Sequence, residues 1–144
     1  MRTDELALDY IGRAEMTLEE ARNAVGNEVY SLAIRRAQET AELSLKAALR
    51  YLAIEYPRDH DVSDVLLRVK EIRPLPNWFK ERIGFMASVS SDLARKRGPA
   101  FYGDERTFIP ASQLFTEEEG LRALNAAEEV FKLCKRLIKE NMSK

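Results

Sequence analysis

The chain has 144 residues, of which 45% are hydrophobic and 33% charged, and its formal net charge is −1. This length suits one domain with a hydrophobic core of its own, so we expect a single domain over residues 1–144. The near-neutral charge excludes a general polybasic nucleic-acid clamp, so any contact with RNA or DNA must be local.

The composition predicts no metal, cofactor or membrane contact. Cys134 and His60 are the single cysteine and the single histidine, so the chain offers neither an internal disulfide nor a zinc-binding set. The acidic start MRTDELALDYIGRAEM does not resemble a signal peptide, and no apolar run approaches the ~20 residues of a membrane span. We therefore expect a cytoplasmic protein, and the scarcity of asparagine and glutamine fits a thermophilic or archaeal source.

Two long helices are expected in the first part of the chain. Apolar residues recur at helical spacing over residues 4–24, and VGNE supplies residues that tolerate a left-handed cap. Residues 28–54 repeat apolar positions every three or four residues, and their alanines allow a neighbouring helix to approach closely. This second helix should stop before Pro57, because the residue preceding a proline is disfavoured in the helical region.

Three further helices are expected in the second part. A short one begins near Asp61 and closes at RPLP, and a fourth covers residues 77–95. The loop ARKRGPAFYGDERTFIP follows, and the last helix begins in FTEEEGLRAL, where Thr116 and Glu119 have the spacing of a capping box. No segment alternates like a strand, so the fold class is all-α, an up-and-down bundle of four or five helices.

A polar row lies on the second helix. Gln38, Glu42 and Lys46 are spaced by four residues and so share one face. One interpretation is a solvated stripe with a weak Glu–Lys pair, and the other is the border of a polar groove that faces the loop after the fourth helix.

The loop after the fourth helix holds the candidate binding residues. Arg95 and Arg97 are expected at the helix end, where positive charge is favourable. An arginine can also donate two parallel hydrogen bonds to a phosphate, and Tyr102 could stack on a base. The alternative is that Phe101 and Tyr102 only pin the loop to the bundle.

His60 lies among acidic residues before the third helix. It is interpreted as a loop or capping residue, and Asp59, Asp61 and Asp64 around it suggest at most weak cation binding, because the spacing and glycine of a calcium loop are missing.

Taken together, AQETAELSLKAALRYL, HDVSDVLLRV, RGPAFYGDE, IPASQLFTEEEGLRAL and AAEEVFKLCKRLI resemble the HEPN (higher eukaryotes and prokaryotes nucleotide-binding) domain family over residues 5–140. The resemblance implies a helical bundle, commonly a homodimer, in small prokaryotic proteins often paired with a minimal nucleotidyltransferase in toxin–antitoxin-like operons. Many members are metal-independent ribonucleases with an arginine, four to six residues and then a histidine.

This chain departs from that motif at its second position. Arg97 matches the arginine, but Tyr102 stands where the histidine is expected, and a phenol with a pKa of ~10 is a poor proton carrier at neutral pH. The favoured interpretation is therefore a nucleotide- or RNA-binding module rather than an enzyme, with Arg97 on a phosphate, Tyr102 stacking, and Arg95, Lys46 and Glu42 lining the groove. The alternatives are a ribonuclease in which the fold or a dimer brings in His60, and a purely structural interaction protein.

Overall fold

The computed structural model describes residues 3–142, which form seven helices and no strand. This confirms the predicted all-α class. In chain order the helices are α1 (Thr3–Gly26), α2 (Tyr30–Tyr51), α3 (Ser63–Ile72), α4 (Asn77–Lys80), α5 (Ile83–Tyr102), α6 (Ala111–Leu114) and α7 (Glu117–Met142). None of the helices in the described part of the chain combines the length and the apolar character that crossing a membrane requires.

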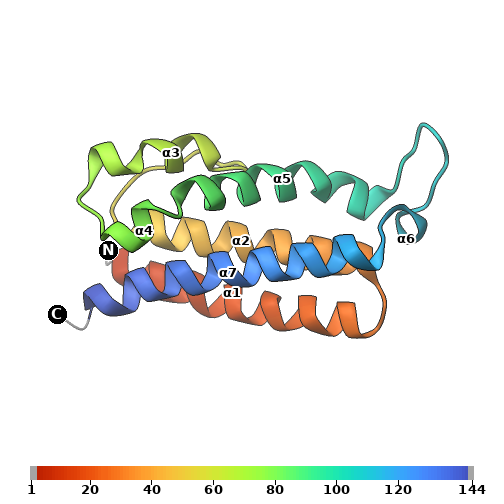
Figure 1. Cartoon of the computed structure of the whole chain (residues 1–144), viewed down its shortest axis with the longest axis horizontal. Helices are drawn as coiled ribbons and strands as arrows, with labels where there is room; N and C mark the ends of the chain where they lie inside the picture. The colour runs from red at the N-terminus through yellow and green to blue at the C-terminus, as the bar shows by residue number, and fades with distance from the viewer. Residues whose placement is uncertain (1–2, 143–144) are drawn as a thin grey trace.

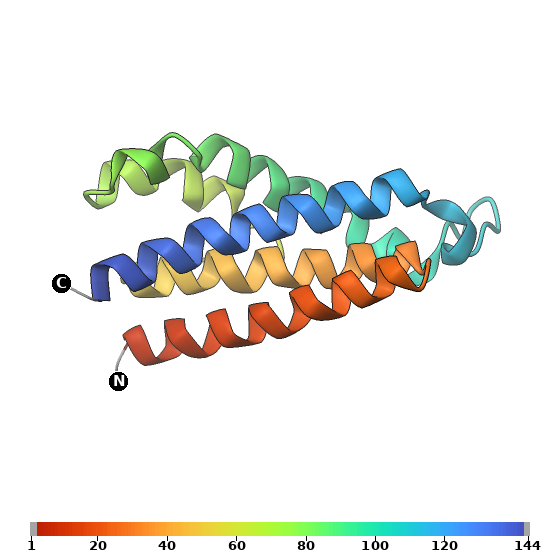
Figure 2. The same ribbon diagram turned by 60° about the horizontal axis from the view of Figure 1, so that its bottom comes forward.

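Four long helices make an up-and-down bundle, with α2 at its centre (Figures 1 and 2). Helix α2 packs against α1, α5 and α7, while α3 packs on α5. Both described ends of the chain lie at the same end of the bundle, and the loop between α5 and α7 projects from the other end. Helices α1 and α5 therefore flank α2, and this arrangement decides which of its side chains meet those of α5.

Small side chains explain the close packing of α1 on α2. Ala7, Ala14 and Ala21 recur every seven residues along α1 and are fully buried, which is the spacing of a helix–helix seam. The hydroxyl groups of Thr17 and Thr40 meet across this seam at 2.7 Å. The predicted alanine seam is confirmed on α2, whose buried alanines are Ala33, Ala37, Ala41, Ala47 and Ala48.

Helix α2 ends at Tyr51, earlier than the predicted residue 54, and Pro57 is not the cause. Ala53 has a φ of 58°, in the left-handed region that terminates helices. The Arg73 guanidinium donates hydrogen bonds to the carbonyl of Leu52 at 2.9 Å and to that of Ala53 at 3.3 Å. A distant arginine therefore caps the end of α2.

The predicted fourth helix, residues 77–95, begins at the correct residue but is wrong in its continuity and at its end. A break separates α4 from α5, and α5 continues through Gly98 and Pro99 to Tyr102. Pro99 lies in the last turn, where its missing N–H and its ring affect only the preceding turn. Arg95 and Arg97 are therefore inside α5, not at its end.

Gly103 is the residue that ends α5. Its φ is 75°, its N–H donates to the Pro99 carbonyl at 2.8 Å, and a Cβ there would collide with the carbonyl of Ile109. The loop then closes by paired backbone bonds between Asp104 and Ile109, of 2.8 and 3.0 Å.

The capping box that begins α7 is confirmed. The backbone N–H of Thr116 donates to Glu119 Oε1 at 3.0 Å, and the Glu119 N–H donates to Thr116 Oγ1 at 3.2 Å. Cys134, further along α7, is fully buried, and burial raises the pKa of its thiol.

Candidate functional site

Arg97 projects from α5 onto α2 and is held there by two side chains. Its Nη1 donates to Gln38 Oε1 at 2.6 Å and lies 3.8 Å from Glu39 Oε2. Gln38 is 1% exposed, whereas a third of the Arg97 side chain remains accessible. The arginine is thus fixed by a buried amide and still offers part of its guanidinium to a ligand.

Glu42 joins this arginine to a lysine and a histidine. Its Oε1 accepts a hydrogen bond from Gln38 Nε2 at 2.8 Å and lies 2.7 Å from His60 Nδ1, while its Oε2 accepts from Lys46 Nζ at 2.8 Å. We call Gln38, Glu42, Lys46, His60 and Arg97 the Glu42 network. The polar row of α2 is therefore not a solvated stripe, because it faces α5 and the segment that precedes α3.

The Glu42 carboxylate stays ionised in this setting. Burial alone raises its pKa, but hydrogen bonds from Lys46, Gln38 and His60, with the charge of Lys46, outweigh burial and hold the pKa of Glu42 below its usual value. An ionised carboxylate only accepts, so His60 must donate from Nδ1. The Nε2 of His60 is then the nitrogen that can accept a proton.

Arg97 and His60 line one cavity of about 340 Å³. We call it the Arg97 cavity; it opens between α1, α2 and α5, beside the segment that precedes α3. Its full lining is Arg13, Met16, Thr17, Glu20, Glu39, Glu42, Leu43, His60 and Arg97. An arginine and a histidine that lie far apart in the sequence thus face a common space.

Two of the predicted site residues lie elsewhere. Arg95 is exposed and pairs with Asp92 at 2.8 Å. Tyr102 is 67% exposed and meets the ring of Phe101 edge-on, with centroids 4.6 Å apart. Because a helix turns by ~100° per residue, five positions separate Arg97 and Tyr102 by ~140° around α5. The predicted groove therefore brings together Arg97, Glu42 and Lys46, but neither Arg95 nor Tyr102.

The acidic residues near His60 are used in hydrogen bonding. Asp61 Oδ1 accepts the backbone N–H of Ser63 at 2.9 Å and the hydroxyl of Ser90 at 3.1 Å, which ties the start of α3 to α5. Within residues 3–142, no group of three or more histidine, cysteine or acidic side chains is placed to hold a metal ion.

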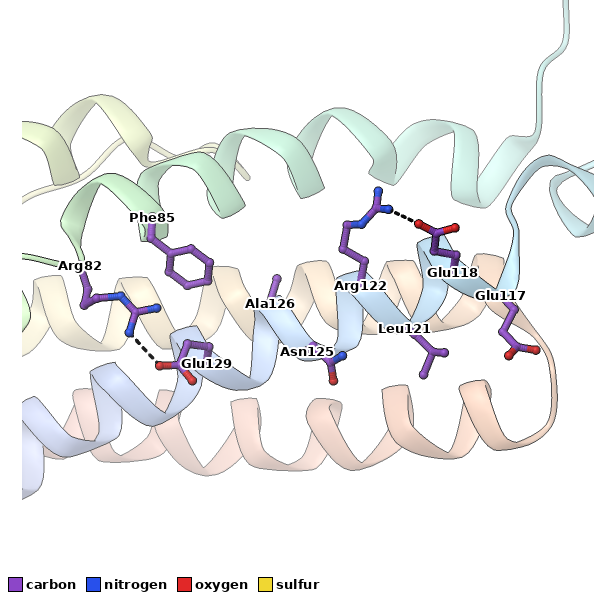
Figure 3. A pocket seen from close by; sticks show the side chains of 9 residues that line it. All are labelled: Arg82, Phe85, Glu117, Glu118, Leu121, Arg122, Asn125, Ala126 and Glu129. Carbon is purple, nitrogen blue, oxygen red and sulfur yellow. Dashed lines mark hydrogen bonds and ion pairs between the residues drawn. The ribbon is translucent and has the colours of Figure 1, made fainter.

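A larger groove, of about 740 Å³, lies between α5 and α7 (Figure 3). Its two arginines are already paired: Arg82 contacts Glu129 at 3.0 Å and Arg122 contacts Glu118 at 2.6 Å. Each of these arginines is bound directly to a carboxylate, whereas the closest partner of Arg97 is the neutral amide of Gln38. Arg97 is therefore the better candidate for a phosphate, even with Glu20, Glu39 and Glu42 in the lining of its cavity.

Comparisons with known proteins agree with this fold. The HEPN domain family model matches residues 7–137, and the chain belongs to this family. The crystal structure of an archaeal HEPN homologue is similar, with a TM-score of 0.71 and 26% identity over 96% of this chain and 99% of the other. A crystal structure of a protein from Thermus thermophilus shares the fold, with a TM-score of 0.69 and 24% identity over 90% of this chain and 96% of the other. A search among curated proteins found no match.

Proposed function

We propose that this chain binds RNA or nucleotides through the Arg97 cavity. The observation that carries the proposal is that Arg97 and His60 line one cavity and are joined through Gln38 and Glu42. A guanidinium fixed on one side by Gln38 keeps N–H groups for a phosphate oxygen, and its orientation is settled before the ligand arrives.

Titration with ATP and with a short RNA tests this proposal. We expect Arg97→Ala to weaken binding of both at least ~10-fold, which corresponds to the loss of a charge-assisted hydrogen bond. Arg95→Ala is the matched control, because Arg95 lies on the same helix but pairs with Asp92 away from the cavity. Equal affinity of wild type and Arg97→Ala, or no binding by wild type, contradicts the proposal.

A second candidate function, metal-independent RNA cleavage, is favoured by the pair of His60 and Glu42. With Glu42 accepting from Nδ1, His60 Nε2 would take the proton of a ribose 2′-hydroxyl. The 2′-oxygen would attack the phosphorus held by Arg97 and form a 2′,3′-cyclic phosphate, while the bond from phosphorus to the 5′-oxygen breaks and that oxygen takes a proton from solvent water. In this chain His60 would stand in for the histidine that the family motif places after the arginine.

Cleavage of a short RNA in the presence of a metal chelator tests this candidate. We expect His60→Ala to lose at least ~100-fold in rate, the lower range for a general base, with Tyr102→Phe unchanged. Cleavage that persists in His60→Ala rules out His60 as the proton carrier, and a wild type that binds RNA without cleaving it leaves the binding function alone.

We also propose that the protein is a cytoplasmic homodimer that works with a nucleotidyltransferase partner in a toxin–antitoxin-like pair. Membership of the HEPN family and the exposed aromatic side chains of Phe101, Tyr102 and Phe108 support an association surface. A purely structural interaction protein would use the same side chains. Sedimentation with and without the product of the neighbouring gene tests this, and a strictly monomeric species in both conditions contradicts it.

A further inference from the structure

A second cavity, of about 560 Å³, adjoins the first. We call it the Arg50 cavity. It shares Glu42 and His60 with the Arg97 cavity, so the two are neighbours along α2. Its lining is Tyr10, Glu42, Lys46, Arg50, Tyr56, Pro57, Arg58, Asp59 and His60.

Arg50 is the central cation of this cavity and has no acidic partner in the described chain. Its guanidinium lies over the rings of Tyr10, at 5.2 Å, and Tyr56, at 5.4 Å, and its Nε is buried without a hydrogen-bond acceptor. A partly buried charge with an unmet N–H is costly unless an anion completes it.

The two tyrosines are polar partners of Arg50 but bring no carboxylate. Burial raises the pKa of Tyr10, but hydrogen bonds from Tyr56 and Arg50 outweigh burial and hold that pKa below its usual value. Burial, and then a hydrogen bond to Tyr10, raise the pKa of Tyr56 to about 12, so Tyr56 keeps its proton at neutral pH. It therefore does not supply a negative charge to Arg50.

The rim of the cavity adds further positive charge. Arg58 is exposed and makes no ion pair or hydrogen bond within residues 3–142, and Lys46 contacts Glu42. The lining thus carries three cations, Lys46, Arg50 and Arg58, against two carboxylates, those of Glu42 and Asp59. The charge of the lining is therefore balanced by the binding of one further negative group.

We propose that Arg50 and Arg58, with Lys46, form a second phosphate-binding subsite for an RNA strand, of which another phosphate, further along the strand, lies at Arg97. This inference rests on the proposed binding of RNA at the Arg97 cavity. Gln38, Glu42, Lys46 and Arg50 follow one another at four-residue steps along α2. At ~1.5 Å per residue, the row from Gln38 to Arg50 spans ~18 Å. One ligand reaches both subsites only if it carries more than one phosphate along a strand.

Fluorescence anisotropy with a short RNA, a ribonucleoside monophosphate and inorganic phosphate tests the subsite. We expect Arg58→Ala to weaken RNA binding ~3- to 10-fold and to lower the salt slope by about one, as for the loss of one phosphate contact. Binding of the monophosphate should not change. Arg50→Met, which keeps most of the side-chain packing, should have the same selective effect.

Arg68→Ala is the matched control, because Arg68 is another exposed arginine outside the lining of both cavities. Arg58 makes no contact that folding needs, so its variant remains informative even if Arg50→Met unfolds. RNA binding that is lost in Arg97→Ala but equal in Arg58→Ala and Arg68→Ala overturns the subsite alone. Absence of RNA binding by wild type overturns the proposed function and the subsite with it. Inorganic phosphate binding that depends on Arg58, without any effect on RNA, identifies a free-phosphate site and also overturns the proposal.

Discussion

Two regions of α5, five residues apart, have opposite character. Around Arg97 every polar side chain has a partner, and a buried amide fixes the arginine against α2. Around Tyr102 the side chains are exposed, and the Phe101 ring meets the Tyr102 ring and the guanidinium of Arg35, which lies 4.4 Å from the ring centroid. In a loop, a spacing of five residues could bring Arg97 and Tyr102 together. In a helix the same spacing points them in different directions, so the two ends of the family motif lie on different surfaces of this molecule.

The largest expected effect comes from Gly103, the residue that ends α5 directly after Tyr102. Gly103→Val places a side chain at a φ of 75° and against the Ile109 carbonyl, so the loop must move. We expect a loss of ~2–4 kcal/mol in the free energy of unfolding, measured by urea denaturation.

Gly98→Ala is the control for this change. Gly98 lies inside α5 with open space around its Cα, so alanine should leave stability unchanged or raise it by up to ~1 kcal/mol. Equal denaturation midpoints for Gly103→Val and wild type contradict the assignment of Gly103 as the end of α5.

The next effect concerns the centre of the Glu42 network. Glu42→Ala leaves the Gln38 amide and Lys46 without their acceptor, and we expect a loss of ~1–3 kcal/mol in the free energy of unfolding. Glu39→Ala, which removes a neighbouring acid from the rim, should cost less. An equal or larger loss for Glu39→Ala would show that Glu42 is not the structural centre.

The ionisation of Glu42 should make the free energy of unfolding depend on pH, and this effect is smaller than that of Glu42→Ala. Because the pKa of Glu42 is lower in the folded than in the unfolded chain, its stabilisation is fully present above the ordinary glutamate pKa of ~4.3. This stabilisation is lost as the pH falls through the pKa that Glu42 has in the folded chain. Glutamine cannot ionise, so the Glu42→Gln variant lacks this pH-dependent stabilisation. The difference in free energy of unfolding between wild type and Glu42→Gln should therefore become smaller as the pH falls from about 5 to about 3. A difference that stays constant over this range contradicts the shift.

The smallest effects are expected at the exposed aromatic residues. Phe108 is 90% exposed with a φ of 59°, and Tyr102 is 67% exposed. Tyr102→Ala and Phe108→Asn should each change the free energy of unfolding by no more than ~0.5 kcal/mol, with asparagine tolerating the left-handed backbone. Both variants should bind RNA as wild type does. A loss of affinity in Tyr102→Ala as large as in Arg97→Ala would join the two regions into one site.

Local patterns in the sequence predict much of this molecule. The alanines of α2, the capping box before α7 and the four-residue spacing of the polar row of α2 follow from residues within one or two turns, and each is present. These features are predictable because they depend on spacing within a single helix. Arg97 as a phosphate ligand was also named from the sequence and stays a prediction.

Other features depend on distant residues, and the sequence pattern misses them. His60 reaches Glu42 only because the segment between α2 and α3 folds back along α2, and the end of α2 depends on capping by Arg73. The fourth helix was expected to end at residue 95, but α5 continues through Pro99, because a proline in a last turn interrupts few hydrogen bonds. The placement of His60 in the Arg97 cavity could have been suspected only from its being the single histidine in the chain.

The four-residue steps of the α2 row also give the site a handedness. Each step advances ~400° around the helix, a net turn of ~40°, so the row winds in the same sense as the helix itself. A strand that touches Arg97 and Arg50 in turn must cross α2 obliquely with that screw sense.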